Sequence, residues 1–168
     1  IEFPVWAVKW TQHTQPPSID VTPNQRNVAV DDEPEIRNPL RTSLEMARSS
    51  VDLAEDGEEA WQLLQSETYD CILPDLKMPR MDGRQVYKLL RELDKSAAEG
   101  IIFITKDTAY RDTQDFVYST GILIMNKPFQ LDELLSQIGK WLMETEAAKS
   151  RRWPNRAQPA VSLPRMGI

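Results

Sequence analysis

The sequence of 168 residues has one cysteine, one histidine and no long apolar run. A single cysteine, Cys71, excludes an internal disulfide framework and a cysteine-rich zinc site. No stretch approaches 18 apolar residues, so we expect no membrane-spanning helix. No basic segment followed by an apolar run and a small-residue cleavage site opens the chain, which argues against a signal peptide. The first residue is Ile1 rather than Met, so we interpret the sequence as a fragment of a longer protein. We expect that protein to be soluble and cytoplasmic.

Charge and proline divide the chain into three parts. The net charge is −6, but residues 1–25 carry −1 and residues 147–168 carry +5, which leaves −10 in the middle. Seven of the 12 prolines lie in the first 25 and last 15 residues. Proline lacks an N–H donor, so these ends are poor material for a core. We therefore predict a linker at 1–25, a domain at 26–146 and a basic tail at 147–168. The acidic domain disfavours nucleic acid.

Short apolar runs alternate with helical patterns through the predicted domain. This alternation predicts an α/β fold, a doubly wound parallel sheet with helices on both faces. Pro39 is expected to kink or shorten the first helix, and Pro74 to distort the third strand. The predicted strands are 27–30, 50–54, 69–76, 101–104 and 122–125. The helical patterns lie at 34–47, 60–64, 86–93, 111–120 and 131–142.

Chemically active side chains follow the predicted strands. Asp31 and Asp32 follow the first, Asp75 the third, Thr105 the fourth and Lys127 the fifth. The carboxyl ends of parallel strands share one edge of a sheet, so these residues should meet in one crevice. Three carboxylates repel one another unless a cation is present, and oxygen ligands with water suit Mg²⁺ or Mn²⁺. Together with a lysine and a hydroxyl, they form a set of groups suited to phosphoryl transfer.

Four motifs carry a family resemblance. The runs VAVDDEP at 28–34, YDCILPDLKMPRMDG at 69–83, IIFITKD at 101–107 and NKPF at 126–129 resemble the receiver domain of two-component response regulators. Any one of these motifs is weak, but four in order at strand ends are a strong signal. The resemblance implies a CheY-like, flavodoxin-like (βα)5 sandwich whose five parallel strands have the order 2-1-3-4-5.

The resemblance also implies a role for each residue of the predicted crevice. Asp75 would accept the phosphoryl group. Asp31, Asp32 and Asp75, with the backbone carbonyl of Lys77, would hold Mg²⁺. Thr105 would bond to the phosphoryl group and move when it arrives. Without the other motifs, paired acids after a strand can equally be the favourable negative charge at a helix N-terminus.

The remaining implied features concern Lys127 and the partners. Lys127 would pair with the phosphate and precede a cis bond to Pro128. The partners would be a histidine kinase, a His-containing phosphotransfer protein or both, and a homodimer is an open alternative. The run 104–134 resembles receivers fused to the C-terminus of hybrid histidine kinases, and residues 1–9 resemble the last strand of a kinase ATP-binding domain. The domain would catalyse the transfer of a phosphoryl group from its partner to itself and the slow removal of that group. It would not be a kinase by itself, although the longer protein would then be a histidine kinase.

Some residues depart from the family pattern and keep alternatives open. Pro74 precedes the acceptor, Lys106 replaces a small residue, and Ile124 stands where an aromatic switch residue is usual. Lys106 either adds positive charge to the site or points to solvent. Pro74 and Ile124 motivate an alternative, a pseudo-receiver that binds partners without being phosphorylated, although the intact acidic residues, Thr105 and Lys127 argue against it. A third hypothesis, an Asp-nucleophile phosphatase, lacks its second Asp, because Lys77 occupies that position.

Overall fold

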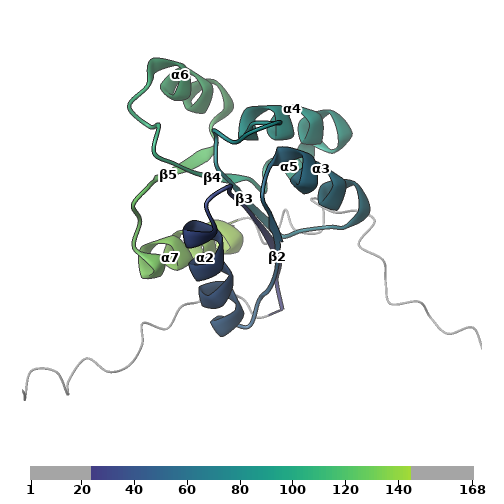
Figure 1. The fold of residues 1–168 in the computed structure, drawn as a ribbon, viewed down its shortest axis with the longest axis vertical. Coiled ribbons are helices and arrows are strands. Elements are labelled where there is room, and N and C mark those ends of the chain that lie inside the picture. The colour runs from purple at the N-terminus through teal and green to yellow at the C-terminus, as the bar shows by residue number, and fades with distance from the viewer. Residues whose placement is uncertain (1–23, 145–168) are drawn as a thin grey trace, which may run out of the picture.

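A computed structural model describes residues 24–144. Residues 1–23 and the tail at 147–168 lie outside the described residues, so the linker, the kinase-like opening and the basic tail stay predictions. Strands and helices alternate along the described chain (Figure 1). In order they are β1 Arg26–Val30, α2 Pro34–Met46, β2 Ser50–Ala54, α3 Gly57–Ser66, β3 Cys71–Pro74, α4 Gly83–Leu93, α5 Lys95–Ala98, β4 Ile102–Thr105, α6 Arg111–Thr120, β5 Leu123–Asn126 and α7 Leu131–Glu144.

The strands are parallel and follow the predicted order. β1 pairs with β2 on one side and β3 on the other, and β4 pairs with β5. A single parallel bridge, Ile72 to Ile101, joins β3 to β4, and the Ile72 N–H donates to the Gly100 carbonyl at 3.0 Å. The order 2-1-3-4-5 is therefore confirmed, but as two ladders that meet at one bridge.

Pro74 explains why the two ladders meet so briefly. The Asp75 N–H donates to Val30 of β1 at 2.9 Å, while the Ile72 N–H faces β4. Alternate residues of a strand face opposite neighbours, so the nitrogen of Pro74 also faces β4, where it has no hydrogen to donate. The predicted distortion of this strand is thus a missing ladder bond, and β3 ends at Pro74 rather than at residue 76.

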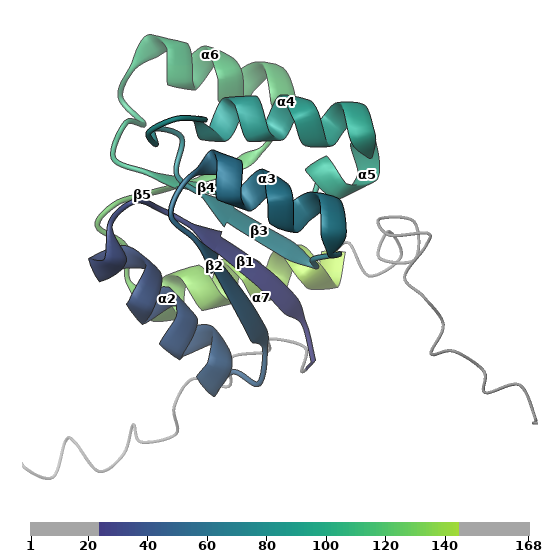
Figure 2. The same ribbon diagram turned by 45° about the vertical axis from the view of Figure 1, so that its right-hand side comes forward.

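Figure 2 shows α3, α4, α5 and α6 on one face of the sheet and α2 and α7 on the other. A hydrophobic cluster lies under the helices of each face. Alternation along β1 directs Val28 and Val30 into the cluster under α3, α4 and α5, and Ala29 into the cluster under α2 and α7. Phe116 of α6 packs against the first cluster. Each fully buried Val, Leu or Phe contributes about 1.5–3 kcal/mol, so these clusters supply most of the stability of the sandwich.

The helices differ from the prediction in two places. Pro39 does not shorten the first helix, because α2 continues to Met46. Leu40 and Leu44, on its inner face, are 1% and 0% exposed, and this packing outweighs the hydrogen bond that Pro39 removes. A sixth helix, α5, was not predicted. Its N-cap residue is Asp94, whose carboxylate accepts hydrogen bonds from the N–H groups of Ser96 and Ala97.

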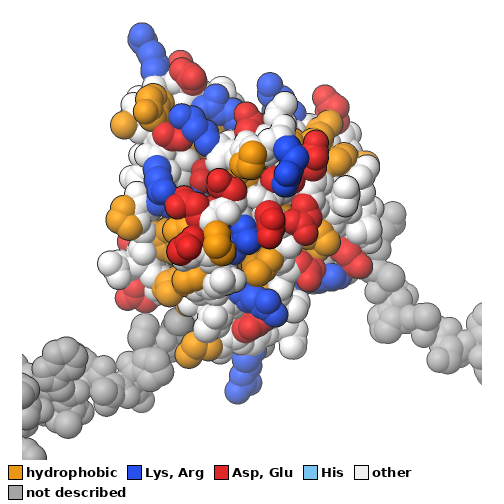
Figure 3. All heavy atoms as spheres, viewed as in Figure 1, with side chains coloured by type: hydrophobic (Ala, Val, Ile, Leu, Met, Phe, Trp, Pro, Cys, Tyr) orange, Lys and Arg blue, Asp and Glu red, His pale blue; other side chains and the backbone are white. Residues whose placement is uncertain are grey.

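The described surface carries mixed charge. On the face shown in Figure 3, lysine and arginine side chains are interspersed with aspartate and glutamate. Within residues 24–144, none of the helices combines the length and the apolarity that crossing a bilayer requires.

Candidate functional site

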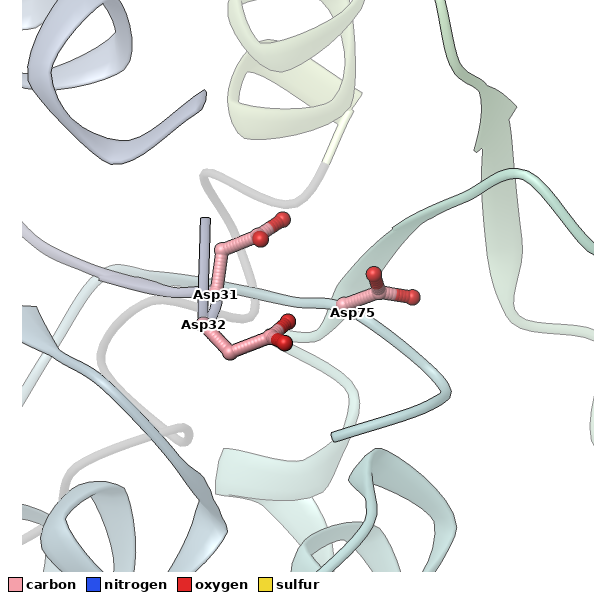
Figure 4. Close-up of side chains that lie close together, drawn as sticks. All are labelled: Asp31, Asp32 and Asp75. Carbon is pink, nitrogen blue, oxygen red and sulfur yellow. The ribbon is translucent and has the colours of Figure 1, made fainter. Parts of the chain in front are cut away.

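The carboxylates predicted to meet do lie together. The β1–β3 register pairs Val30 with Pro74, so the next residues, Asp31 and Asp75, are neighbours across the ladder. Ligand oxygens of Asp31, Asp32 and Asp75 all lie within 4.8 Å of one another. Figure 4 shows Asp31 and Asp32 extending from the end of β1 toward the side where Asp75 lies. Asp31 and Asp75 are buried, and Asp32 is exposed.

Lys127 reaches this cluster from the other ladder. Its backbone N–H donates to the Thr105 carbonyl at 2.9 Å, which aligns the ends of β4 and β5. Its ammonium donates to Asp75 Oδ2 at 2.7 Å and forms an ion pair with Asp31. The side chain is 1% exposed, so water screens these charges little. The bond between Lys127 and Pro128 is cis, as the resemblance implies.

Burial and pairing act in opposite directions on these charges. Desolvation raises the pKa of Asp31 above its ordinary value, although the hydrogen bond from Lys127 acts the other way. Burial alone would lower the pKa of Lys127, but its hydrogen bonds to Asp31 and Asp75 outweigh it, and the pKa is raised. Asp31 is therefore a costly buried charge, and Lys127 stays protonated.

The donor set fits a hard divalent cation. The cluster has three aspartate carboxylates and one ammonium, so it keeps a net negative charge when all are ionised. The second oxygens of the two buried carboxylates accept backbone hydrogen bonds, Asp31 Oδ1 from Glu33 at 2.9 Å and Asp75 Oδ1 from Lys77 at 3.2 Å. Oxygen ligands of this number, completed by water, suit Mg²⁺.

Thr105 lies at the end of β4 and is fully buried. Its hydroxyl accepts a hydrogen bond from the Asp107 N–H at 3.3 Å. Its backbone pairing with Lys127 places it at the same edge of the sheet as the carboxylates. The predicted residues of the crevice are therefore brought together, while the role of the Thr105 hydroxyl stays a prediction.

Two ion pairs connect the loops around the site. The ammonium of Lys106 lies 2.7 Å from a carboxylate oxygen of Glu33. Lys106 therefore neither points freely to solvent nor contacts the acceptor, but forms an exposed ion pair between the β4–α6 loop and the β1–α2 loop. Its hydrogen bond lowers the pKa of Glu33. Lys77 pairs with Asp107 at 3.1 Å and lies over the ring of Tyr110, 4.4 Å from its centroid.

At Gly83, the start of α4 lies very close to the backbone of the proposed acceptor. A Cβ atom there would lie 2.2 Å from the backbone oxygen of Asp75 and 2.9 Å from a ring carbon of Phe103. Only glycine permits the start of α4 to approach Asp75 so closely. The sequence analysis missed this residue, because one glycine at a helix start carries no such signal.

Arg37 was also missed. It is 8% exposed, and its guanidinium donates to the backbone carbonyl of Asp31. A signal was available, because Arg37 lies three and seven residues before the core residues Leu40 and Leu44 and so on the buried stripe of α2.

The chain resembles known proteins over this same region. A family model described as "Response regulator receiver domain" matches residues 28–139. The chain belongs to this family. The receiver is 33% identical over 120 residues to "Response regulator MprA" of Mycolicibacterium vanbaalenii, covering 71% of this chain and 51% of that protein. It is 31% identical over 156 residues to the same regulator of Mycobacterium bovis, covering 83% of this chain and 67% of that protein.

Solved structures agree with the fold of the receiver. Response regulator protein TrrA from Thermotoga maritima, described in complex with Mg²⁺-BeF, is 32% identical with a TM-score of 0.58, and the match covers 70% of this chain and 99% of that one. A CheY-like receiver domain protein from Methanospirillum hungatei is 25% identical with a TM-score of 0.68 over 74% of this chain and 98% of that one. The receiver thus spans about half the length of the first matched curated relative.

Proposed function

We propose that Asp75 of this receiver accepts a phosphoryl group from a phosphohistidine in a Mg²⁺-dependent reaction. The observation that carries the proposal is the position of the Lys127 ammonium between Asp75 and Asp31, 2.7 Å from the proposed nucleophile. A buried lysine at that position can pair with the oxygens of an arriving phosphoryl group. The partners are a histidine kinase or a His-containing phosphotransfer protein.

Each residue of the cluster would have its own role in this reaction. A carboxylate oxygen of Asp75 attacks phosphorus as the bond from phosphorus to the histidine nitrogen breaks, and the electron pair stays on the imidazole, which takes up a proton. Asp31, Asp32, Asp75 and the Lys77 carbonyl would hold Mg²⁺, which, when bound, neutralises charge on the phosphoryl oxygens. Lys127 pairs with one of these oxygens.

The product would change the balance of contacts at both ladders. Phosphorylation converts the Asp75 carboxylate into an acyl phosphate with added negative charge. The Thr105 hydroxyl, at the end of β4, would donate to a phosphoryl oxygen and move toward it. Residue 124 is an isoleucine and not an aromatic residue, and its side chain is half-buried against the first core cluster. A signal through α6 and β5 would therefore depend on changes in packing. Slow hydrolysis of the acyl phosphate would reset the receiver.

Phosphorylation by acetyl phosphate, followed by intact mass, tests the proposal. We expect a gain of one phosphate that requires Mg²⁺ and is absent in Asp75→Ala. Asp115→Ala, an exposed carboxylate on α6, is the matched control and should behave like the unaltered chain. A parallel reaction with Mn²⁺ asks whether that ion can substitute. Phosphorylation that persists in Asp75→Ala would contradict the assignment of the acceptor.

A pseudo-receiver is the second candidate, and Pro74 favours it. The missing ladder bond lies directly before the acceptor, where the backbone sets the direction of the Asp75 side chain. If a folded chain binds Mg²⁺ but gains no phosphate, the pseudo-receiver is the better description. Restored phosphorylation in Pro74→Ala would then identify the proline as the cause.

A further inference from the structure

Arg37 makes an unusual contact for an arginine on a surface helix. It lies in the first turn of α2, yet its side chain is only 10% exposed. One guanidinium nitrogen donates to the backbone carbonyl of Asp31, and the other lies 3.4 Å from Glu55 Oε1. The Glu55 side chain is 69% exposed, so this second contact is weak. The buried hydrogen bond to the carbonyl is therefore the main polar contact of Arg37.

This contact completes the fixation of Asp31. The Asp31 N–H donates to the Ala54 carbonyl at 3.2 Å. The Asp31 carboxylate accepts hydrogen bonds from the Lys127 ammonium and the Glu33 N–H. The carbonyl is the remaining polar group, and it lies beyond the last residue of β1. Arg37 supplies the donor that the ladder no longer provides, because a buried carbonyl without a partner is costly.

The same carbonyl belongs to the peptide group that leads into Asp32. A peptide group is planar, so a hydrogen bond at the Asp31 oxygen also fixes the direction of the Asp32 N–H and Cα. The Asp32 carboxylate is exposed and has no hydrogen bond or ion pair with any residue in 24–144. Its approach to the other two carboxylates, within 4.8 Å, is therefore set mainly by its backbone.

We propose that Arg37 is a positioning residue for the metal site, acting through the Asp31 carbonyl to direct Asp32 toward the ion. The inference rests on the proposed function. A planar guanidinium suits this role, because it donates to the carbonyl from a fixed fork while its second nitrogen faces the next loop. An ammonium at the same position keeps the charge but has a different shape and reach. Loss of such an outer contact typically lowers metal affinity by about 10–100-fold.

Calorimetric titration of the full chain with MgCl₂ tests the role without any phosphodonor. Arg37→Met keeps most of the aliphatic stem and removes the donor, and we expect about 10-fold weaker binding. Arg37→Lys should recover part of the affinity. Arg41→Met, on the next turn of α2 and in an exposed pair with Glu45, is the matched control and should bind like the unaltered chain.

A second pair of measurements separates positioning from stability. Thermal unfolding is followed for each variant, and titrations are made well below every midpoint, so a purely structural role would lower the midpoint and leave the Mg²⁺ affinity unchanged. Glu55→Gln should change the affinity less than twofold, and a loss equal to that of Arg37→Met would overturn the assignment to the carbonyl. Unchanged affinity in Arg37→Met overturns the inference alone, whereas no Mg²⁺ binding by the unaltered chain contradicts the proposed function and the inference with it.

Discussion

Asn27 is a buried amide without a partner, and replacing it should stabilise the protein. The side chain is 0% exposed, and neither its Nδ2 nor its Oδ1 has a hydrogen-bond partner in the described part of the chain. It lies in β1 between Val51 of β2 and Cys71 of β3, on the face that carries the second core cluster. Its surroundings therefore suit an apolar side chain.

Asn27→Val removes both unpaired polar atoms and adds an apolar β-branched side chain. An unsatisfied buried polar group costs about 1–3 kcal/mol, and the buried methyl groups add a favourable term. We expect the free energy of unfolding to rise by about 2 kcal/mol, which corresponds to about 8 °C in the thermal midpoint of a domain this size.

Urea unfolding at equilibrium measures this change. The matched control is Asn126→Val in β5, which makes the same substitution in a strand at an exposed position. It should gain only the difference in strand propensity, well under 1 kcal/mol. Equal or lower stability of Asn27→Val would refute the reasoning, because the amide would then have to make hydrogen bonds in the folded state that valine cannot replace.

Three further predictions concern Pro74, Tyr69 and Gly83. Pro74→Ala restores an N–H facing β4 and should raise the free energy of unfolding by about 1 kcal/mol, as measured by urea unfolding. The new amide should also exchange its hydrogen slowly with solvent. Burial and the hydrogen bond to Asp52 raise the pKa of Tyr69 in the folded state, so stability should fall as the pH rises above about 10, and fall less steeply in Tyr69→Phe. Gly83→Ala places a methyl group against the backbone of Asp75 and should cost about 2–3 kcal/mol and slow phosphorylation by acetyl phosphate. Unchanged stability and phosphorylation in Gly83→Ala would mean that α4 shifts away freely.

The sequence predicted the elements whose pattern is local. The apolar runs at β1 and β4 and the stripe of α7 determine strands and helices through periods that are visible in any short window. The meeting of Asp31, Asp75 and Lys127 followed from one further rule, that the ends of parallel strands share an edge.

Other features depend on side chains that are distant in sequence. Pro39 looks like a helix breaker until the burial of Leu40 and Leu44 is known. The place of Arg37 on the buried stripe of α2 can be read from its spacing to Leu40 and Leu44, but its partner, the Asp31 carbonyl, cannot. The unpaired amide of Asn27 is likewise invisible, because the sequence shows a polar residue in a strand without showing what lies opposite it.

The effect of Pro74 on the sheet bears on how the site is held together. The acidic residues Asp31 and Asp75 follow strands of one ladder, while Thr105 and Lys127 belong to the other. The two ladders share one backbone bridge, so the buried ion pairs of Lys127 are a large part of what joins them at the site. Removing one partner of a buried ion pair costs about 3–5 kcal/mol, more than the net contribution of a ladder hydrogen bond. A phosphoryl group on Asp75 would give Lys127 a new partner on the same ladder as before, so the connection between the two ladders would be kept while its geometry changes.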